Sequence, residues 1–583
     1  MKKVGPARIS TWISVFAFFL VILTAGGESW AQRVPGGGGL QQPRPGDRRL
    51  ELPDIEPLPK GPDFKLPTVP KVKPEAPLST GPQFVLKGVQ FQGNSVFSDA
   101  DLLAVAAPFL DRPVSTEDIE RLRRALTLYY IDAGYVNSGL VLPDQRVIDG
   151  VVLFQVVEGE LTNIEITGTE RMKSFYVRDR LALGAGPPLN VKRLQERFRI
   201  LMEDPLIDRL DAELGPGEQP GESVLKVDVN EPPVLRTFIG FDNARSPSVG
   251  AEGGTIDIGF RNLIGIGETM SFGATKSEGL FDTTIRASVP LNAHDTRLSF
   301  NFERSQSDVV ERPFNIVDIE NESDDYELEI RHPFYRAPGQ EFATGLQIAY
   351  RTSTTSLLGE RFSFSPGVDD GRSRVWVARM VSDWLDRSAD AVFAVRSTVS
   401  LGLDIFNATS NSGSTPDGQF VSWLGQAQWV RRLGDGGTRL VLRGDTQLTP
   451  DRLLPLEKFS VGGIDTVRGY RENLLTRDNG WAASIEVRIP IFELRIPHLS
   501  SDPAFGQVEL APFFDAGRSW DNDIKDAKPK GIYSVGAGLR WAPSPDMFFN
   551  VYYGMQMRDV NDPPDSDLQD DGIHFRMGGS VFF

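Results

Sequence analysis

The segment "GWAASIEVRIPIF" (480–492) alternates apolar and polar side chains along most of its length. Apolar residues stand at each odd position from Trp481 to Ile491, while Ser484, Glu486 and Arg488 share the other face. This period of two is typical of a β-strand with one apolar face. The segment "MFFNVYYGMQM" (547–557) has the same pattern, and similar runs recur from residue 235 onward between loops rich in Gly, Asp, Asn and Ser. We therefore predict antiparallel β-structure for the C-terminal part of the chain.

The loops between these runs favour a membrane barrel over a soluble sandwich. Aromatic residues gather at strand ends, and connections such as "GERFSFSPGVDDGRS" (359–373) are long and polar, as in a transmembrane barrel with a polar lumen. No stretch after the N-terminal segment approaches the roughly 20 apolar residues of a spanning helix, so a membrane can be crossed here only by a closed barrel. We predict a transmembrane β-barrel of about 16 antiparallel strands over residues 234–583. The predicted strands begin near Leu235, Gly254, Glu268, Phe281, Thr296, Asp325, Gln340, Arg374, Ala391, Gly418, Thr438, Gly480, Phe505, Gly531, Met547 and Gly572.

The C-terminal segment "GIHFRMGGSVFF" (572–583) alternates up to a terminal aromatic residue, Phe583. We interpret it as the strand that closes the barrel. Phe583 is predicted to be the signal that the barrel-assembly machinery recognises during insertion.

The first 82 residues have no pattern of a folded domain. "MKKVGPAR" is basic, an apolar run follows, and "SWA" offers small residues at a cleavage site, which together predict a secretory signal peptide over 1–31. An N-terminal membrane anchor is the alternative, because the run is close to the length of a spanning helix. Residues 32–82 are rich in Pro and Gly, which predicts a linker, with a proline-rich ligand as the alternative.

Two units of one architecture separate this linker from the barrel, at residues 83–158 and 159–233. Each is predicted to run β-α-α-β-β. In "STEDIERLRRALTLYYIDAGY" (115–135), Ser115 is a plausible N-cap, with Asp118 three residues later. Helical spacing then groups Ile119, Leu122, Leu126 and Tyr129 on one apolar face. Such small mixed domains carry sheet edges that can bind an extended peptide.

A long loop over residues 445–479 interrupts the barrel pattern. It joins the eleventh and twelfth predicted strands. Because successive strands run in opposite directions from the two small domains, this connection lies at the far end of the barrel, and its length suggests a function. It contains the tetrapeptide "VRGY", which is Val467, Arg468, Gly469 and Tyr470. Alternation along "GQVELAPFFDAGRSW" (506–520) places Val508, Leu510, Pro512 and Phe514 toward lipid, and Glu509 and Asp515 toward the lumen. An arginine that folds into the lumen needs an opposite charge, and Asp515 is a candidate.

These features resemble one superfamily of outer-membrane β-barrels. "VRGY" is similar to its loop motif, and "FFDAG" (513–517) resembles the partner motif on a nearby strand, with Phe513, Asp515 and Gly517 as its residues. Two β-α-α-β-β units before such a barrel resemble the POTRA pair of two-partner secretion transporters (TpsB, the hemolysin secretion/activation family). The resemblance extends from Phe84 to Phe583.

The resemblance implies a fold, a location and a function. The chain would have two periplasmic α+β POTRA domains and a barrel in the outer membrane of a Gram-negative bacterium, in contact with outer-membrane lipids. It would capture a large β-helical exoprotein (an adhesin, a hemolysin or a toxin) with its POTRA domains and export it unfolded through the barrel, without ATP. Arg468 would anchor the loop to Asp515.

Other functions fit the sequence less well. A formal net charge of −17 argues against nucleic acid as a partner. With no cysteine, scattered histidines and no recognisable nucleophile, phosphate-binding or zinc motif, we expect no enzymatic activity, no catalytic residue, no metal site and no cofactor. A factor that inserts other outer-membrane proteins is the main alternative function, and a passive porin is a further one.

Overall fold

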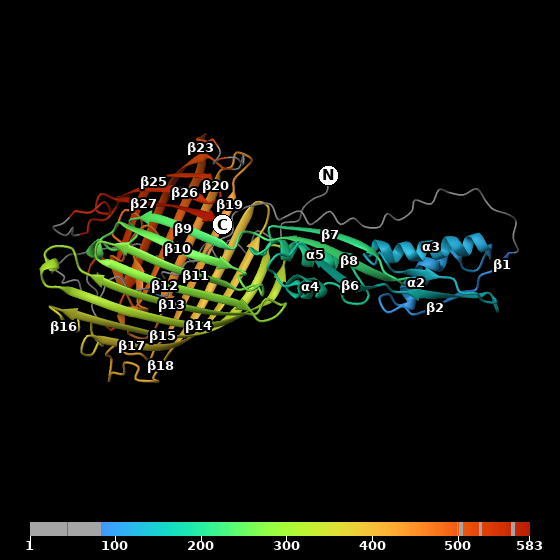
Figure 1. Ribbon diagram of the computed structural model, residues 1–583, viewed down its shortest axis with the longest axis horizontal. Coiled ribbons are helices and arrows are strands. Elements are labelled where there is room, and N and C mark those ends of the chain that lie inside the picture. Colours follow the sequence, from blue (N-terminus) through green and yellow to red (C-terminus); the bar gives the residue numbers. More distant parts are fainter. Residues whose placement is uncertain (1–43, 45–82, 498–499, 501–504, 524–527, 561–565) are drawn as a thin grey trace.

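The computed structural model describes residue 44 and residues 83–497, 500, 505–523, 528–560 and 566–583. The predicted signal peptide (1–31), and the predicted linker (32–82) apart from Arg44, lie outside these residues. The described chain forms a barrel with two small domains arranged in a row at one end (Figure 1). No helix in the described ranges combines the length and apolar character needed to cross a membrane.

The first small domain packs two helices on a three-stranded sheet. Strand β2 pairs in parallel with β5, and β4 pairs antiparallel on the other side of β5. A short ladder between β1 and β3 accompanies this sheet. The elements are β1 (Phe84–Val85), β2 (Gly88–Gln92), α2 (Asp99–Ala106), η3 (Ala107–Phe109), β3 (Pro113–Val114), α3 (Thr116–Asp132), β4 (Gly139–Val141) and β5 (Val151–Val157).

Helix α3 begins as the sequence indicates but turns a slightly different face to the core. The Ser115 hydroxyl and the Asp118 carboxylate form a capping box, which satisfies amide groups of the first turn. The buried tyrosine is Tyr130, whereas Tyr129 is exposed, so the prediction for Tyr129 was wrong. Tyr130 lies three helical turns after Ile119 and therefore on the same face of the helix. Tyr129 is rotated about 100° from Tyr130 around the helix axis.

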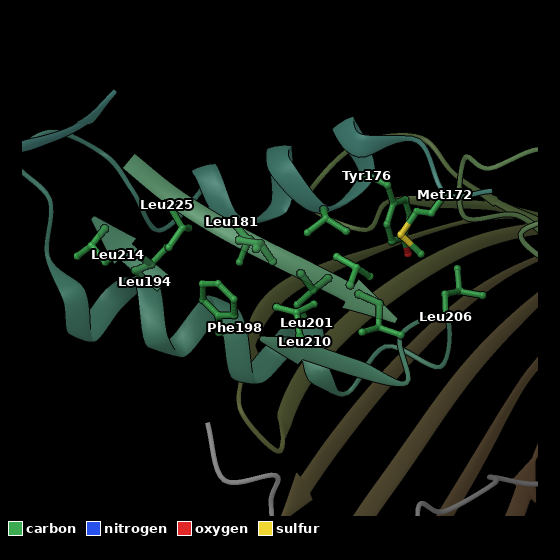
Figure 2. Packing of buried hydrophobic residues seen from close by; sticks show 14 of the residues in the cluster. Met172, Tyr176, Leu181, Leu194, Phe198, Leu201, Leu206, Leu210, Leu214 and Leu225 are labelled. Atoms are coloured by element: carbon green, nitrogen blue, oxygen red, sulfur yellow. The ribbon is translucent and has the colours of Figure 1, made fainter. Parts of the chain in front are cut away.

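The second small domain repeats this topology. Strand β8 is central, parallel to β6 and antiparallel to β7. Leu194, Phe198 and Leu201 of α5 pack with Leu225 of β8 in one apolar core (Figure 2). The elements are β6 (Glu160–Thr167), α4 (Ser174–Ala182), α5 (Val191–Met202), β7 (Arg209–Pro216) and β8 (Glu222–Asn230).

Sixteen long strands of the described chain close into an antiparallel barrel, which confirms the predicted fold class. Strand β27 pairs with β9 to close it, and β15 pairs directly with β17, so the two-residue β16 (Glu360–Arg361) is only an extension. The predicted starts agree closely, except that β14 begins six residues before Asp325. The barrel strands are β9 (Leu235–Asp242), β10 (Gly253–Arg261), β11 (Thr269–Ser277), β12 (Leu280–Pro290), β13 (Arg297–Asp308), β14 (Ile319–Ala337), β15 (Gln340–Leu357), β17 (Arg372–Arg387), β18 (Ala391–Leu403), β19 (Val421–Arg432), β20 (Arg439–Leu448), β23 (Asn479–Glu493), β24 (Gln507–Trp520), β25 (Gly531–Ser544), β26 (Met547–Gln556) and β27 (Ile573–Phe582).

The two faces of the barrel wall follow the alternation in the sequence. Ile485 and Tyr553 point outward and are 49% and 56% exposed, whereas their neighbours Glu486 and Tyr552 are buried inside. Val508 is an exception to the predicted pattern, because it is buried beside a register shift in the pairing of β23 with β24.

The second domain is fixed to the near end of the barrel by ion pairs and backbone contacts. Arg180 of α4 donates to Asp295 in the β12–β13 turn at 2.6 and 3.1 Å. Glu203, which follows α5, pairs with Arg387 at the end of β17 at 3.2 Å. The second domain therefore lies directly at the barrel entrance, as Figure 1 shows.

Candidate functional site

The loop between β20 and β23 (449–478), called the lumen loop below, folds back into the barrel. It contains η6 (Pro455–Glu457) and a short hairpin of β21 (Phe459–Val461) and β22 (Leu475–Arg477). The sequence predicted its start at Asp445, but Asp445 still pairs with Ala482 of β23, so the strand is longer and the loop shorter than expected. Although a loop normally runs over the surface, most residues of the lumen loop are buried or half-buried.

Arg468 of the lumen loop reaches the inner wall at β24 and β23. Its Nε donates to Asp515 Oδ2 at 2.8 Å, and its Nη2 donates to Asp515 Oδ1 at 2.9 Å. The backbone N–H of Arg468 also donates to Asp515, at 3.0 Å. Glu486 pairs with Nη1, and Ser484 Oγ accepts from Nη2 at 3.0 Å. The guanidinium thus has the planar, two-sided coordination that suits arginine and that lysine cannot reproduce.

Two aromatic rings, which contact each other edge to face, also contact this guanidinium. The Arg468 carbon Cζ lies 3.7 Å from the ring centre of Phe513 and 4.8 Å from that of Tyr552. Such contacts add cation–π attraction and keep water away from the ion pair. Arg468 is 5% exposed and Asp515 is fully buried, so the pair is strongly coupled and poorly screened by salt.

The two motif glycines give the lumen loop room to approach the wall. Gly469 has φ of +89°, and a Cβ there would lie 2.5 Å from the carbonyl oxygen of Gly554 on β26. Its amide donates to Nε2 of His574 on β27 at 2.9 Å. A Cβ on Gly517 of β24 would collide with Val461 and lie 3.1 Å from the Val467 side chain. Both positions therefore require the absence of a side chain.

The remaining motif residues complete the docking. Val467 and Tyr470 are fully buried in a cluster that also contains Val461, Leu475 and Ile532. The Tyr470 hydroxyl lies 2.9 and 3.0 Å from the carbonyl oxygens of Tyr533 and Arg558, and it accepts from the Arg558 amide at 3.1 Å. The structure thus brings Val467, Arg468, Gly469 and Tyr470 together with Phe513, Asp515 and Gly517.

Phe583 lies apart from this site, at the seam of the barrel. Its backbone exchanges hydrogen bonds with Leu235 at 2.9 and 3.1 Å, and its side chain is exposed. Its role as an insertion signal stays a prediction.

Three contacts of the lumen loop were not anticipated from the sequence. Glu486 was expected in the lumen but not as a partner of Arg468, although its inward parity and its pairing opposite Phe513 are consistent with that contact. His574, one of the scattered histidines for which the sequence predicted no role, accepts from the Gly469 amide. Arg44, within the predicted linker, is buried and donates to Ser460 Oγ at 2.9 Å, and no pattern around it signals this contact. The described residues contain no cluster of His, Asp or Glu arranged to hold a metal ion.

Comparison with known proteins identifies the group to which this architecture belongs. The family model described as "Haemolysin secretion/activation protein ShlB/FhaC/HecB" matches residues 221–541, more than half of the 583 residues. The chain belongs to this family. A second model, "POTRA domain, ShlB-type", matches residues 84–159 in the first small domain.

Individual members of the family cover most of the chain. "Outer membrane transporter CdiB" of Dickeya dadantii (strain 3937) is 24% identical over 487 residues, which are 79% of this chain and 81% of the relative. "Hemolysin transporter protein ShlB" of Serratia marcescens is 26% identical over 413 residues, 68% and 70% of the two chains. The solved structure of CdiB from Escherichia coli superposes with a TM-score of 0.65 at 20% identity, over 88% of this chain and 93% of that one.

Family membership and fold together locate the protein. It lies in the outer membrane of a Gram-negative bacterium, with its POTRA domains in the periplasm. The relatives are outer-membrane transporters, which confirms the predicted class of function. The lumen loop therefore enters the barrel from the external end.

Replacing Gly469 by alanine is expected to loosen the lumen loop. The new methyl group would meet the backbone of Gly554, and the positive φ itself costs about 1–3 kcal/mol for a residue with a side chain. We expect trypsin to cleave the purified protein within 464–478 about tenfold faster, because local opening governs cleavage. Gly413→Ala is the matched control, since Gly413 also has positive φ but has open space around it. Equal cleavage in both variants would show that the contact with Gly554 does not hold the loop.

Proposed function

We propose that the protein is a two-partner secretion transporter that captures an unfolded, large exoprotein with its POTRA domains and exports it through the barrel without ATP. The observation that carries this proposal is the buried clamp of Arg468 with Asp515 and Glu486, which holds the lumen loop inside the barrel. A barrel of 16 strands is wide enough to leave an aqueous channel. A loop docked in it by buried charges and a tyrosine suits a closed state that cargo opens, and it does not suit a passive porin.

The POTRA domains are suited to an extended chain by their open sheet edges. In the second domain the edge strands are β6 and β7, each eight residues long, whereas β4 of the first domain has three. An extended segment that pairs with such an edge is held by main-chain hydrogen bonds, which tolerate many sequences. Because the second domain contacts the barrel turns, a segment bound there already lies at the entrance.

The cargo itself can supply the direction of export. A chain that leaves the lumen and folds outside gains roughly 0.05–0.15 kcal/mol per residue, and a folded β-helix is too wide to return. For an exoprotein of several hundred residues this gain exceeds ten kcal/mol, so export needs no nucleotide in this scheme. We propose an adhesin, a hemolysin or a toxin with β-helical repeats as the partner.

The purified fragment 84–233 should retain the unfolded N-terminal region of the cognate exoprotein in a pull-down. The fragment contains both small domains, each with its own apolar core. The matched control is the folded repeat region of the same exoprotein, which has no unpaired strand to add and should not be retained. Retention of the N-terminal region by a barrel that lacks residues 84–233 would contradict the proposed capture step.

A further inference from the structure

A second buried ion cluster lies where the lumen loop meets another part of the barrel wall. In the Arg468 clamp the loop supplies the cation and the wall supplies the carboxylates, and in the second cluster these roles are exchanged. Here the loop supplies the carboxylate, Glu457 of η6, and the wall supplies two arginines. Arg351 of β15 donates from Nη1 to Glu457 Oε1 at 2.7 Å. Arg379 of β17 donates from Nη2 to both carboxylate oxygens, at 2.9 and 3.0 Å. All three side chains are almost completely buried.

This cluster and the Arg468 clamp hold the lumen loop at distant points of the barrel. Strands β18, β19 and β20 separate β17 from β23 in the order of the barrel. Beyond Arg468, the loop residue Asp465 pairs with Arg576 of β27 at 3.0 Å. The contacts therefore extend from β15 to β27, more than half of the strand order, so the lumen loop spans the lumen instead of lying over its own strands.

The two clusters differ in what remains on the wall if the loop leaves. Arg351 also pairs with Asp325 of β14 at 3.3 Å, and Arg379 with Glu327 of the same strand at 3.8 Å. Without Glu457 the wall thus keeps two arginines next to two carboxylates, a neutral set. At the other cluster, Glu486 keeps Arg488 of β23 at 2.7 Å, but Arg468 is the cation that pairs with Asp515 within the described residues, so its departure leaves Asp515 without a paired cation.

This difference between the two clusters determines which anchor of the lumen loop can be released at the lower cost in free energy. Separating a buried ion pair is costly mainly because one charge is left without a partner. The wall at β15 and β17 avoids this cost, since Asp325 and Glu327 remain in place, and the released Glu457 is hydrated in the channel. The wall at β24 has no such replacement for Arg468.

We propose that Glu457 is a positioning residue and the releasable anchor of the lumen loop: it holds the closed loop on β15 and β17, and it leaves the wall while Arg468 stays docked. This inference rests on the proposed role of the lumen loop as the closure of the export channel. Under this proposal the two halves of the lumen loop behave differently when the channel opens. The half of the loop that contains η6 moves away from the wall at β15 and β17, and the half that contains the VRGY motif remains as the pivot.

The test uses the full-length protein and a single introduced cysteine. Because the chain has no cysteine, Leu454→Cys, at a fully buried site beside η6 that packs in one cluster with Val375 and Val377 of β17, reports release of this half of the loop by its rate of labelling with a thiol reagent. Adding Glu457→Gln should raise this rate about tenfold, the factor that corresponds to one charge-assisted hydrogen bond. Adding Glu360→Gln, at an exposed carboxylate on the same external side, should leave the rate unchanged.

Two further measurements distinguish a releasable anchor from a merely structural ion pair. Arg379→Gln combined with Glu457→Gln should label no faster than Glu457→Gln alone, because the two changes remove one interaction. Export by Glu457→Gln should be retained, in contrast to Arg468→Ala. Unchanged labelling, additive effects of the two substitutions, loss of the heat-modifiable barrel or loss of export would each overturn the proposal. The labelling needs no cargo, so it remains decisive even if the proposed transport function is wrong.

Discussion

Export is expected to fall to a small fraction of the wild-type level in Arg468→Ala, while the barrel still assembles. The substitution leaves Asp515 fully buried without its cation, which costs about 3–5 kcal/mol for a pair of this kind. It also removes the cation that contacts the rings of Phe513 and Tyr552. None of these groups takes part in strand pairing through its side chain, so the ladder of β23, β24 and β25 should persist.

The measurement combines the amount of exoprotein in the medium with heat-modifiable migration of the barrel. Arg468→Lys should restore export only in part, because an ammonium group cannot donate to Asp515 through two nitrogens and to Glu486 at the same time. Ser299→Ala, a small change on the barrel wall away from the lumen loop, should export normally. Normal export by Arg468→Ala would show that the clamp is not part of the transport cycle.

The reciprocal exchange, Arg468→Asp together with Asp515→Arg, tests the pairing itself. The new arginine on β24 would still lie close to Glu486, and the new aspartate could approach it from the loop. The rings of Phe513 and Tyr552 would then face a carboxylate, which they do not stabilise. We therefore expect more export than from either single substitution and less than from the wild type.

The barrel was predictable because its signal is local and repeated. In β23, side-chain parity alone placed Ile485 toward lipid and Glu486 toward the lumen, and the structure confirms both. The same parity gave the inward position of Asp515. The number of strands and the two POTRA units follow from such patterns, since each strand or helix satisfies its own periodicity wherever it lies.

The contacts of the lumen loop were not predictable in the same way. Parity determines the side that a residue faces, but not how deeply a loop of 30 residues descends or which strands it reaches. The pairing of Arg468 with Asp515 was expected through a family resemblance, whereas Glu457, His574 and Arg44 had no comparable motif. One usable signal was overlooked: Gly554 interrupts an aromatic strand, and such a glycine often marks a close approach of another backbone.

The use of charges to dock the lumen loop follows from the conditions inside a channel. An apolar plug would expose apolar surface to water whenever it moved, at about 25 cal/mol per Å². A charged contact is hydrated instead once the channel opens, so much of the lost attraction is recovered. Ion pairs buried only in the closed state can therefore make a closure that is firm and still reversible.

Deleting Ile464 to Glu472 is expected to turn a nearly closed barrel into a stable pore. The deletion removes the whole VRGY motif, with the contacts of Arg468, Gly469 and Tyr470. It should leave the β21–β22 hairpin intact, because Val461 pairs with Leu475 and the four residues between them, 462, 463, 473 and 474, can connect the two strands. The barrel strands lie outside the deleted range.

Single-channel recordings in planar bilayers should show small, brief conductance steps for the wild type and a several-fold larger, persistent conductance for the deletion variant, since a 16-stranded barrel is wide enough for an aqueous channel once residues 464–472 no longer fill part of its lumen. The matched control removes Ser412 and Gly413 from the exposed β18–β19 loop, which shortens an external connection but retains Ser414, whose carbonyl oxygen accepts from Arg452 of the lumen loop at 2.7 Å. Its conductance should equal that of the wild type. Equal conductance before and after deletion of 464–472 would mean that these residues do not obstruct the channel, and the role of the lumen loop as its closure would have to be abandoned. An increase in the deletion variant alone would instead assign the obstruction to the segment that Arg468 holds against β24.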